Sequence, residues 1–245
     1  MLFLTSALLG VPHGFSLRTG GVSVGPLASL NLSEGVGDAA QNVQENVRRL
    51  AAAARCAPEQ LATVRQVHGD RVVRAVPGTA EAADALWTED RGVWVAVRCA
   101  DCVPVLLSSA DGRRVAAVHS GWRGTALRVV ARAVEVLAGQ GEKPAGLRAA
   151  VGPCIQACCY EVGQELAARF VASFGPQVVR EGATRPHLSL SAAVKATLLS
   201  AGLRPESVDV HAACTACEPE RFYSHRRDGG VTGRHFAFIS PAPLS

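Results

Sequence analysis

Apolar residues recur every three or four positions in four segments of the chain, the spacing of one face of an α-helix. The first segment follows Asp38, a residue type that caps helix N-termini, and the second stops at Gly139, a residue type that ends helices. The four predicted helices span about residues 43–54, 126–137, 163–174 and 191–201.

Short runs rich in apolar and β-branched residues separate these helices and predict strands. The predicted strands lie at 13–18, 63–67, 72–76, 93–98, 105–108, 115–118, 147–151, 208–212 and 236–239. Asp111 and Gly112 between two of the runs are a hairpin signal, so part of the sheet is expected to be antiparallel. No linker or repeat interrupts the chain. We therefore predict an α+β fold, a single domain over residues 1–245 with mixed, partly antiparallel β-sheets flanked by helices.

The composition indicates a packed globular core, because 48% of the residues are hydrophobic and only 19% are charged. No apolar run approaches the ~20 residues that cross a bilayer, so no membrane partner is expected. The N-terminal stretch lacks the basic region of a secretory signal, so we expect the chain to begin at Met1, to be cytoplasmic and to keep its eight cysteines as thiols. The net charge of +4 comes from scattered arginines with few aromatics, a pattern that argues against nucleic-acid binding.

Three residues of metal-binding type stand at the ends of predicted strands, each followed by turn-forming sequence: His68, Cys102 and His119. Strand ends present side chains to a shared cleft, so the three can converge. Two imidazoles and one thiolate would give Zn²⁺ three ligands and leave the fourth position open, as in catalytic zinc sites. The spacing alone equally allows three separate roles, namely a turn, a packed thiol and a histidine bonded to backbone.

Successive blocks of the chain together resemble one protein family. The blocks include GFSLRTGGVS (14–23), QVHG (66–69), ADAL (83–86), ADCVPVLL (100–107), HSGWRG (119–124), CYEVG (159–163) and YSHRRD (223–228). In order and coverage, from about His13 to Ile239, the chain resembles the laccase-domain family, also called polyphenol-oxidase-like or peptidoglycan-editing-factor proteins.

The resemblance implies a cytoplasmic, zinc-dependent purine nucleoside phosphorylase. Its substrates would be inorganic phosphate and adenosine, inosine, guanosine or methylthioadenosine, with adenosine deaminase activity in the same site. The family's metal-binding His, Cys and His fall on His68, Cys102 and His119 of this sequence. The resemblance also allows copper at this site in vitro, since the family's laccase label came from copper-dependent phenol oxidation.

Several arginines are candidates for binding the anionic substrate. Arg123 is the first candidate for phosphate, because it lies in a Gly-flanked turn that opens a predicted helix. Arg48 on the first predicted helix, and Arg226, Arg227 and Arg234 in the C-terminal block, are further candidates for lining the site. A structural ion pair for Arg123 and a solvated position for the others remain open.

Two more polar residues are candidate site groups. Asn31 suits a hydrogen bond to ribose or base, or alternatively the closure of a turn. Asp101 precedes Cys102 and is a candidate catalytic residue, either as a proton carrier or as support for His68 or His119.

The chain departs from the family pattern at Cys99, where Thr is common, and at Ser189, where Asp is usual and a helix cap or hydrogen bond is therefore in doubt. Cys99 forms a Cys-x-x-Cys pair with Cys102, and Cys214 forms a second with Cys217. These two pairs could make a structural four-cysteine zinc site, although strand alternation does not aim both thiols of the first pair at one metal. We expect the remaining cysteines of the C-terminal half to pack as small apolar groups: Cys154, Cys158 and Cys159.

Other functions use the same residues differently. Cys102 and His119 could form a nucleophilic dyad in an amide hydrolase that edits peptidoglycan precursors, and such a dyad needs no metal. A binding protein with a structural zinc would show no turnover. A copper-dependent polyphenol oxidase (laccase) is disfavoured, because blue-copper sites favour an axial Met and the one methionine is Met1. The sequence leaves the oligomeric state open.

Overall fold

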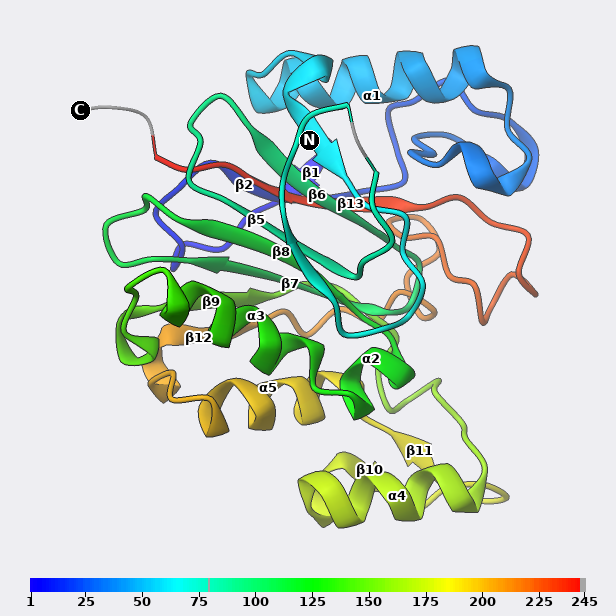
Figure 1. Cartoon of the computed structure of the whole chain (residues 1–245). Coiled ribbons are helices and arrows are strands. Elements are labelled where there is room, and N and C mark those ends of the chain that lie inside the picture. Colours follow the sequence, from blue (N-terminus) through cyan, green and yellow to red (C-terminus); the bar gives the residue numbers. More distant parts are fainter. Residues whose placement is uncertain (79, 243–245) are drawn as a thin grey trace.

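Two β-sheets form the centre of the molecule in the computed structural model, which describes residues 1–78 and 80–242 (Figure 1). The five-stranded sheet has the order β1 (Phe3–Leu4), β2 (His13–Ser16), β13 (His235–Ile239), β6 (Trp94–Cys99), β3 (Leu61–Thr63). The six-stranded sheet has the order β12 (Val208–Val210), β9 (Arg148–Val151), β7 (Val103–Ser108), β8 (Val115–Ser120), β5 (Ala85–Thr88), β4 (Val72–Arg74). Strands β10 (Val179–Arg180) and β11 (His187–Leu188) pair separately.

Helices cover the outer face of each large sheet. Helix α1 (Ala40–Ala54) lies on the five-stranded sheet, and α3 (Val129–Gly139) and α5 (Leu190–Ser200) lie on the six-stranded sheet (Figure 1). The remaining helices are α2 (Trp122–Ala126) and α4 (Gln164–Phe174). Short 3₁₀ turns span Gly25–Leu27, Glu34–Val36, Pro58–Gln60, Pro144–Gly146, Pro176–Val178 and Pro205–Ser207.

The alternation of strand side chains explains why both faces of the six-stranded sheet are apolar. In β7, Val105 and Leu107 pack toward the helices, whereas Leu106 packs toward the five-stranded sheet. All six residues of β7 are buried, so its sequence is a continuous apolar run rather than an alternating one. The predicted α+β fold, a single domain with mixed sheets flanked by helices, is confirmed. The predicted boundaries, 1 and 245, stay a prediction, since residues 243–245 lie outside the described residues.

Most predicted elements are found with ends within two residues of those expected, and the Asp111-Gly112 hairpin joins antiparallel β7 and β8 as predicted. The helix predicted over 126–137 is wrong as one element, because Arg128 adopts left-handed backbone (φ 61°) and separates α2 from α3. Asp38 is not the helix cap. That position is Ala39, and the Asp38 carboxylate instead accepts hydrogen bonds from neighbouring side chains such as Asn42.

The strand predicted over 63–67 is also too long. It ends at Thr63, and Arg65 forms an isolated bridge to Ala82. The sequence did not predict the short strands β1, β5, β10 and β11, because segments of two to four residues show no clear hydrophobic periodicity. No helix among residues 1–78 and 80–242 is long and apolar enough to span a membrane.

Candidate metal centre

Three segments that are far apart in the sequence bring His68, Cys102 and His119 together. Their ligand atoms all lie within 4.8 Å of one another. The two imidazole rings meet edge to face, with centroids 5.0 Å apart and an interplanar angle of 82°. The predicted convergence of these three side chains is therefore present in the fold.

Each of the three residues is held by a different element. His119 is the fifth residue of β8, and Cys102 lies in the turn that joins β6 to β7. His68 lies in the segment between β3 and β4, in left-handed backbone (φ 60°). Gly121 permits the close approach, because a Cβ there would lie 2.9 Å from Cys102 Sγ and 3.1 Å from His68 Cδ2. Only glycine fits there without displacing the candidate ligands.

Asp84 supports two of the three candidate ligands, and sequence reasoning gave it no role. Its fully buried carboxylate accepts a hydrogen bond from His119 Nδ1 at 2.8 Å, which leaves Nε2 of that ring for a metal. It also accepts from the backbone N–H groups of Val67, His68 and Gly69 at 3.1, 3.0 and 2.6 Å. A carboxylate behind a histidine is the usual outer partner of a metal-binding imidazole. The one available signal was an acidic residue between alanines in the block 83–86.

The electrostatics of the group favour a thiolate beside an imidazolium. Burial acts to raise the pKa of the Cys102 thiol, but the imidazoles of His119 and His68 lower this pKa to about 6. Burial acts to lower the pKa of His119, but Cys102 and Asp84 raise it to about 9. The thiolate is the form that binds metals, so the donor set of one thiolate and two imidazoles fits Zn²⁺.

The triad opens into a cavity of about 520 Å³ with a basic wall. Arg65, Arg98 and Arg234 line it, and none has a carboxylate within 4.0 Å among the described residues. Burial lowers the pKa of both Arg98 and Arg234. Arg98 uses Nε to bind the Leu32 carbonyl at 3.2 Å. Guanidinium groups that lack a close carboxylate partner and lie beside a candidate metal site favour an anionic ligand.

The arginines that the sequence suggested for binding the anionic substrate do not all lie at the cavity. Arg234 lines the cavity as considered, whereas Arg48, Arg123 and Arg226 do not belong to its wall. Arg48 is exposed and forms an ion pair with Glu45 at 2.7 Å. Arg123 lies over the ring of Trp122, 4.6 Å from its centroid.

Arg226 and Asp101 contact each other behind Cys102. The Arg226 backbone N–H donates to Asp101 Oδ2 at 2.6 Å, and Thr215 Oγ1 donates to Asp101 Oδ1 at 2.6 Å. The Arg226 side chain donates to the Glu161 carbonyl at 3.0 Å. Asp101 thus anchors the loop next to Cys102, and the carboxylate bonded to a candidate histidine ligand is that of Asp84.

Asn31 is fully buried and its side chain closes a turn. Its Nδ2 donates to the Ser33 carbonyl at 2.9 Å and to Asp38 Oδ2 at 2.9 Å. Its Oδ1 accepts from the backbone N–H groups of Ser33 at 3.2 Å and Arg234 at 3.0 Å. Asn31 therefore positions the segment that carries Arg234, and of the two roles considered for it the structure displays the turn.

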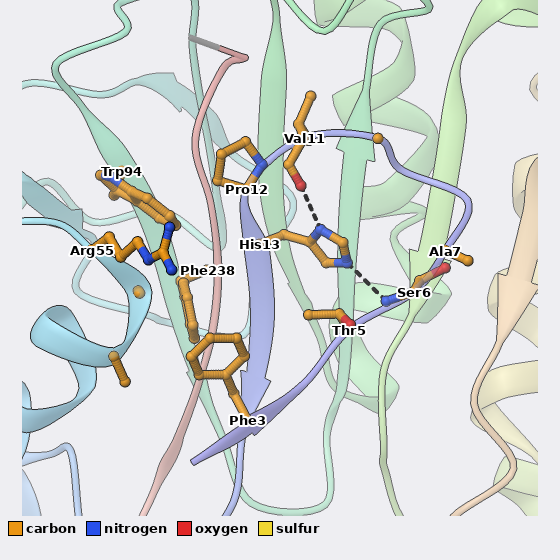
Figure 2. A pocket seen from close by; sticks show the side chains of 13 residues that line it. Phe3, Thr5, Ser6, Ala7, Val11, Pro12, His13, Arg55, Trp94 and Phe238 are labelled. Atoms are coloured by element: carbon orange, nitrogen blue, oxygen red, sulfur yellow. Dashed lines mark hydrogen bonds between the residues drawn. The ribbon is translucent and has the colours of Figure 1, made fainter. Parts of the chain in front are cut away.

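A second cavity, of about 360 Å³, lies at the other end of the β6 and β13 pair (Figure 2). Its wall includes Phe3, Trp94 and Phe238, and His13 uses both ring nitrogens there. His13 Nδ1 pairs with the Val11 carbonyl at 2.7 Å and Nε2 accepts from the Ser6 N–H at 2.8 Å. Among the described residues, no metal-binding group of three or more side chains falls in this cavity.

Comparisons with known proteins find relatives over almost the whole chain. Residues 12–242 match the profile of the family described as multi-copper polyphenol oxidoreductase laccase. A purine nucleoside phosphorylase of Deinococcus radiodurans is 43% identical over 94% of this chain and 89% of its own. The purine nucleoside phosphorylase YlmD of Geobacillus stearothermophilus is 35% identical over 94% of this chain and 90% of its own.

Solved structures share the fold over almost the whole chain. The crystal structure of YlmD from Geobacillus stearothermophilus superposes with a TM-score of 0.91 at 32% identity, covering 99% of both chains. The Neisseria meningitidis protein NMB0706 superposes with a TM-score of 0.89 at 31% identity, covering 99% of this chain and 100% of its own. The chain therefore belongs to the multi-copper polyphenol oxidoreductase laccase family.

Proposed function

We propose that this protein is a zinc-dependent purine nucleoside phosphorylase. It converts adenosine, inosine, guanosine or methylthioadenosine and inorganic phosphate to the free base and a pentose 1-phosphate, and it deaminates adenosine in the same site. The observation that carries the proposal is the triad of His68, Cys102 and His119 at a cavity lined by unpaired arginines. The names of the relatives support the same activity.

Phosphorolysis requires the site to hold phosphate against C1′ of the ribose while the base departs. Arg98 and Arg234 are the groups we assign to phosphate, because both line the cavity and both have guanidinium nitrogens that are not hydrogen-bonded within the described residues. Gln66 fixes Arg98 by exchanging two hydrogen bonds of 2.7 Å with its backbone. Zinc bound to the triad would supply Lewis-acid polarisation and orient the attacking oxygen.

The protein's own residues prepare the triad for that ion. Asp84 fixes the tautomer and orientation of His119, so that Nε2 faces the cavity side of the ring. Asp101 and its partners Thr215 and Arg226 hold the turn that presents Cys102. Zinc suits this donor set better than blue copper does, because the one methionine, Met1, is 95% exposed and does not line the cavity.

A second candidate is amide hydrolysis by a Cys102 nucleophile with His119 as its base. The lowered pKa of Cys102 beside His119 favours this function, since the thiolate is the attacking form. The two functions differ in their need for a metal.

The test is adenosine turnover by purified protein with and without phosphate, with adenine, inosine and ribose 1-phosphate measured separately. We expect phosphate-dependent adenine release in the wild type and its loss in Cys102→Ala. Full activity of the metal-free wild type would refute the zinc mechanism and favour the thiol nucleophile. Bound zinc without turnover of any purine nucleoside would refute the phosphorylase activity.

A further inference from the structure

A second group of cysteines gathers away from the candidate metal centre. The Sγ atoms of Cys158, Cys159, Cys214 and Cys217 all lie within 4.8 Å of one another. Cys217 Sγ is 3.5 Å from Cys158 Sγ and 3.3 Å from Cys159 Sγ. Two of the four, Cys158 and Cys217, are exposed, so they do not pack as small apolar residues.

This grouping corrects the pairing considered from sequence. Cys214 and Cys217 meet Cys158 and Cys159, and not the Cys-x-x-Cys pair formed by Cys99 and Cys102. Cys99 is buried, and Cys102 faces the two histidines. The prediction of packing is wrong for Cys158, which is exposed, whereas Cys159 is half-buried and Cys154 is fully buried as predicted.

The distances suit a single tetrahedral ion. A Zn–S bond of about 2.3 Å places the four sulfurs of a tetrahedral site about 3.8 Å apart. The separations are compatible with that value, since the two sulfurs hydrogen-bonded to Cys217 Sγ lie at 3.3 and 3.5 Å and no pair is farther apart than 4.8 Å. Both of these distances are longer than the ~2.05 Å of a disulfide bond, and all four residues are free thiols.

The backbone around Cys214 favours the thiolate form. The Gln156 N–H points at Cys214 Sγ with a distance of 3.4 Å. A donor aimed at sulfur stabilises its negative charge, as outer partners do in metal sites. Cys214 and Cys217 also have the two-residue spacing of one half of a four-cysteine zinc site.

We propose that Cys158, Cys159, Cys214 and Cys217 bind a second zinc ion in a closed, structural site of four thiolates. Four protein ligands leave no open position, so this ion takes no part in the reaction. A site made only of sulfur selects zinc over the harder cations that carboxylates bind.

The second ion would link two segments that hydrogen-bond to Asp101, the residue before Cys102. Cys158 and Cys159 follow Ile155, whose N–H donates to the Asp101 carbonyl at 3.0 Å. Cys214 precedes Thr215, whose hydroxyl donates to the Asp101 carboxylate at 2.6 Å. The four-cysteine site would therefore stabilise the position of Asp101 and, through it, the turn that carries Cys102.

The experiment counts metal in variants that separate the two sites. We expect about two zinc ions per chain in the wild type, which has one open and one closed site, and about one in Cys102→Ala. Adding Cys158→Ser and Cys217→Ser to Cys102→Ala is expected to remove the remaining ion. Cys56→Ser is the matched control, because Cys56 lies two residues after the end of α1 and outside both groups.

Cobalt substitution gives a second measurement that needs no change in the cluster. Cys102→Ala loaded with Co²⁺ is expected to show the thiolate-to-cobalt charge-transfer absorption of four-sulfur coordination. Absence of both zinc and this absorption in Cys102→Ala, or intact-mass evidence of disulfides among the four cysteines in freshly purified protein, would overturn the proposal. Because the readout is metal content, its failure is distinct from failure of the phosphorylase activity.

Discussion

Replacing Asp84 with Asn tests whether the buried carboxylate organises the candidate zinc centre. The substitution keeps the size of the side chain but replaces one acceptor oxygen with an NH₂ donor. Oδ1 accepts from His119 Nδ1 and the His68 N–H, and Oδ2 accepts from the N–H groups of Val67 and Gly69. Whichever way the new amide is oriented, its NH₂ group therefore replaces the acceptor of two of these four N–H donors.

The magnitude follows from those two lost acceptors. Each unsatisfied buried donor costs about 1–3 kcal/mol, so the zinc-free Asp84→Asn protein is expected to lose roughly 2–6 kcal/mol of unfolding free energy. Loss of an outer carboxylate partner weakens metal binding by about 10- to 100-fold. Both effects have one source, because the same carboxylate holds the His68 segment and the His119 ring.

The assay is zinc affinity by competition with a chelator, together with urea unfolding of the zinc-free protein. Asp70→Asn is the matched control, since Asp70 lies two residues after His68 but its ion pair with Arg132 is long at 3.8 Å. We expect the control to keep wild-type affinity and stability. Wild-type zinc affinity in a folded Asp84→Asn protein would refute the reasoning.

Three further predictions test the cavity, the approach of the ligands and the acid sensitivity of the fold. Arg98→Gln is expected to raise KM for phosphate about 10- to 100-fold, the equivalent of one lost charge-assisted contact of about 1.5–3 kcal/mol. Steady-state kinetics checks this, with Arg48→Gln as the control because the Arg48 ion pair is on the surface. Equal KM values for the two variants would contradict the prediction. Gly121→Ala is expected to weaken zinc binding by roughly 5- to 150-fold, since overpacking costs about 1–3 kcal/mol. Chelator competition should show no such change in Gly139→Ala, where a Cβ meets nothing within 4 Å. His235 is buried, and burial together with Arg18 and Arg234 lowers its pKa from 6.5 to about 3. The unfolded chain therefore binds the extra proton below pH 6.5, and stability falls as the pH drops through that value, by about 2 kcal/mol at about pH 5. Urea unfolding of zinc-free wild type and His235→Gln at about pH 7 and 5 measures this, and an equal pH dependence of the two proteins would contradict it.

The residues that sequence analysis located were those whose local pattern is distinctive. The apolar runs of β6, β7 and β8 predict strands because both of their faces are buried. His68, Cys102 and His119 could be proposed together because each residue type binds metal and each is followed by a turn.

The residues that sequence analysis missed act through contacts between distant segments. Asp84 gave no spacing signal, since its partners are a histidine 35 positions away and three backbone N–H groups. Arg98 lies within a strand, and nothing in its neighbours indicates that the side chain reaches the cavity. Arg123 is the opposite case, a residue that the sequence suggested for phosphate but that does not line the cavity. The helix at its position is only five residues long, and its side chain lies over the Trp122 ring.

The departure at Ser189 proves to be compatible with a helix cap. Ser189 is the N-cap of α5, and its Oγ accepts from the Ala192 N–H at 3.2 Å. Serine and aspartate both cap helices well, so the exchange keeps the hydrogen bond that the sequence left in doubt.

The most direct test of the phosphorylase activity is the rate of adenine release by zinc-loaded protein as the phosphate concentration is raised. The arginine-lined cavity at the triad predicts a saturable rise, with ribose 1-phosphate formed in equal amount to adenine. It also predicts loss of both products when zinc is removed and their return when zinc is restored. An adenine release rate that does not change with phosphate, or that survives complete removal of zinc, would contradict the proposed function.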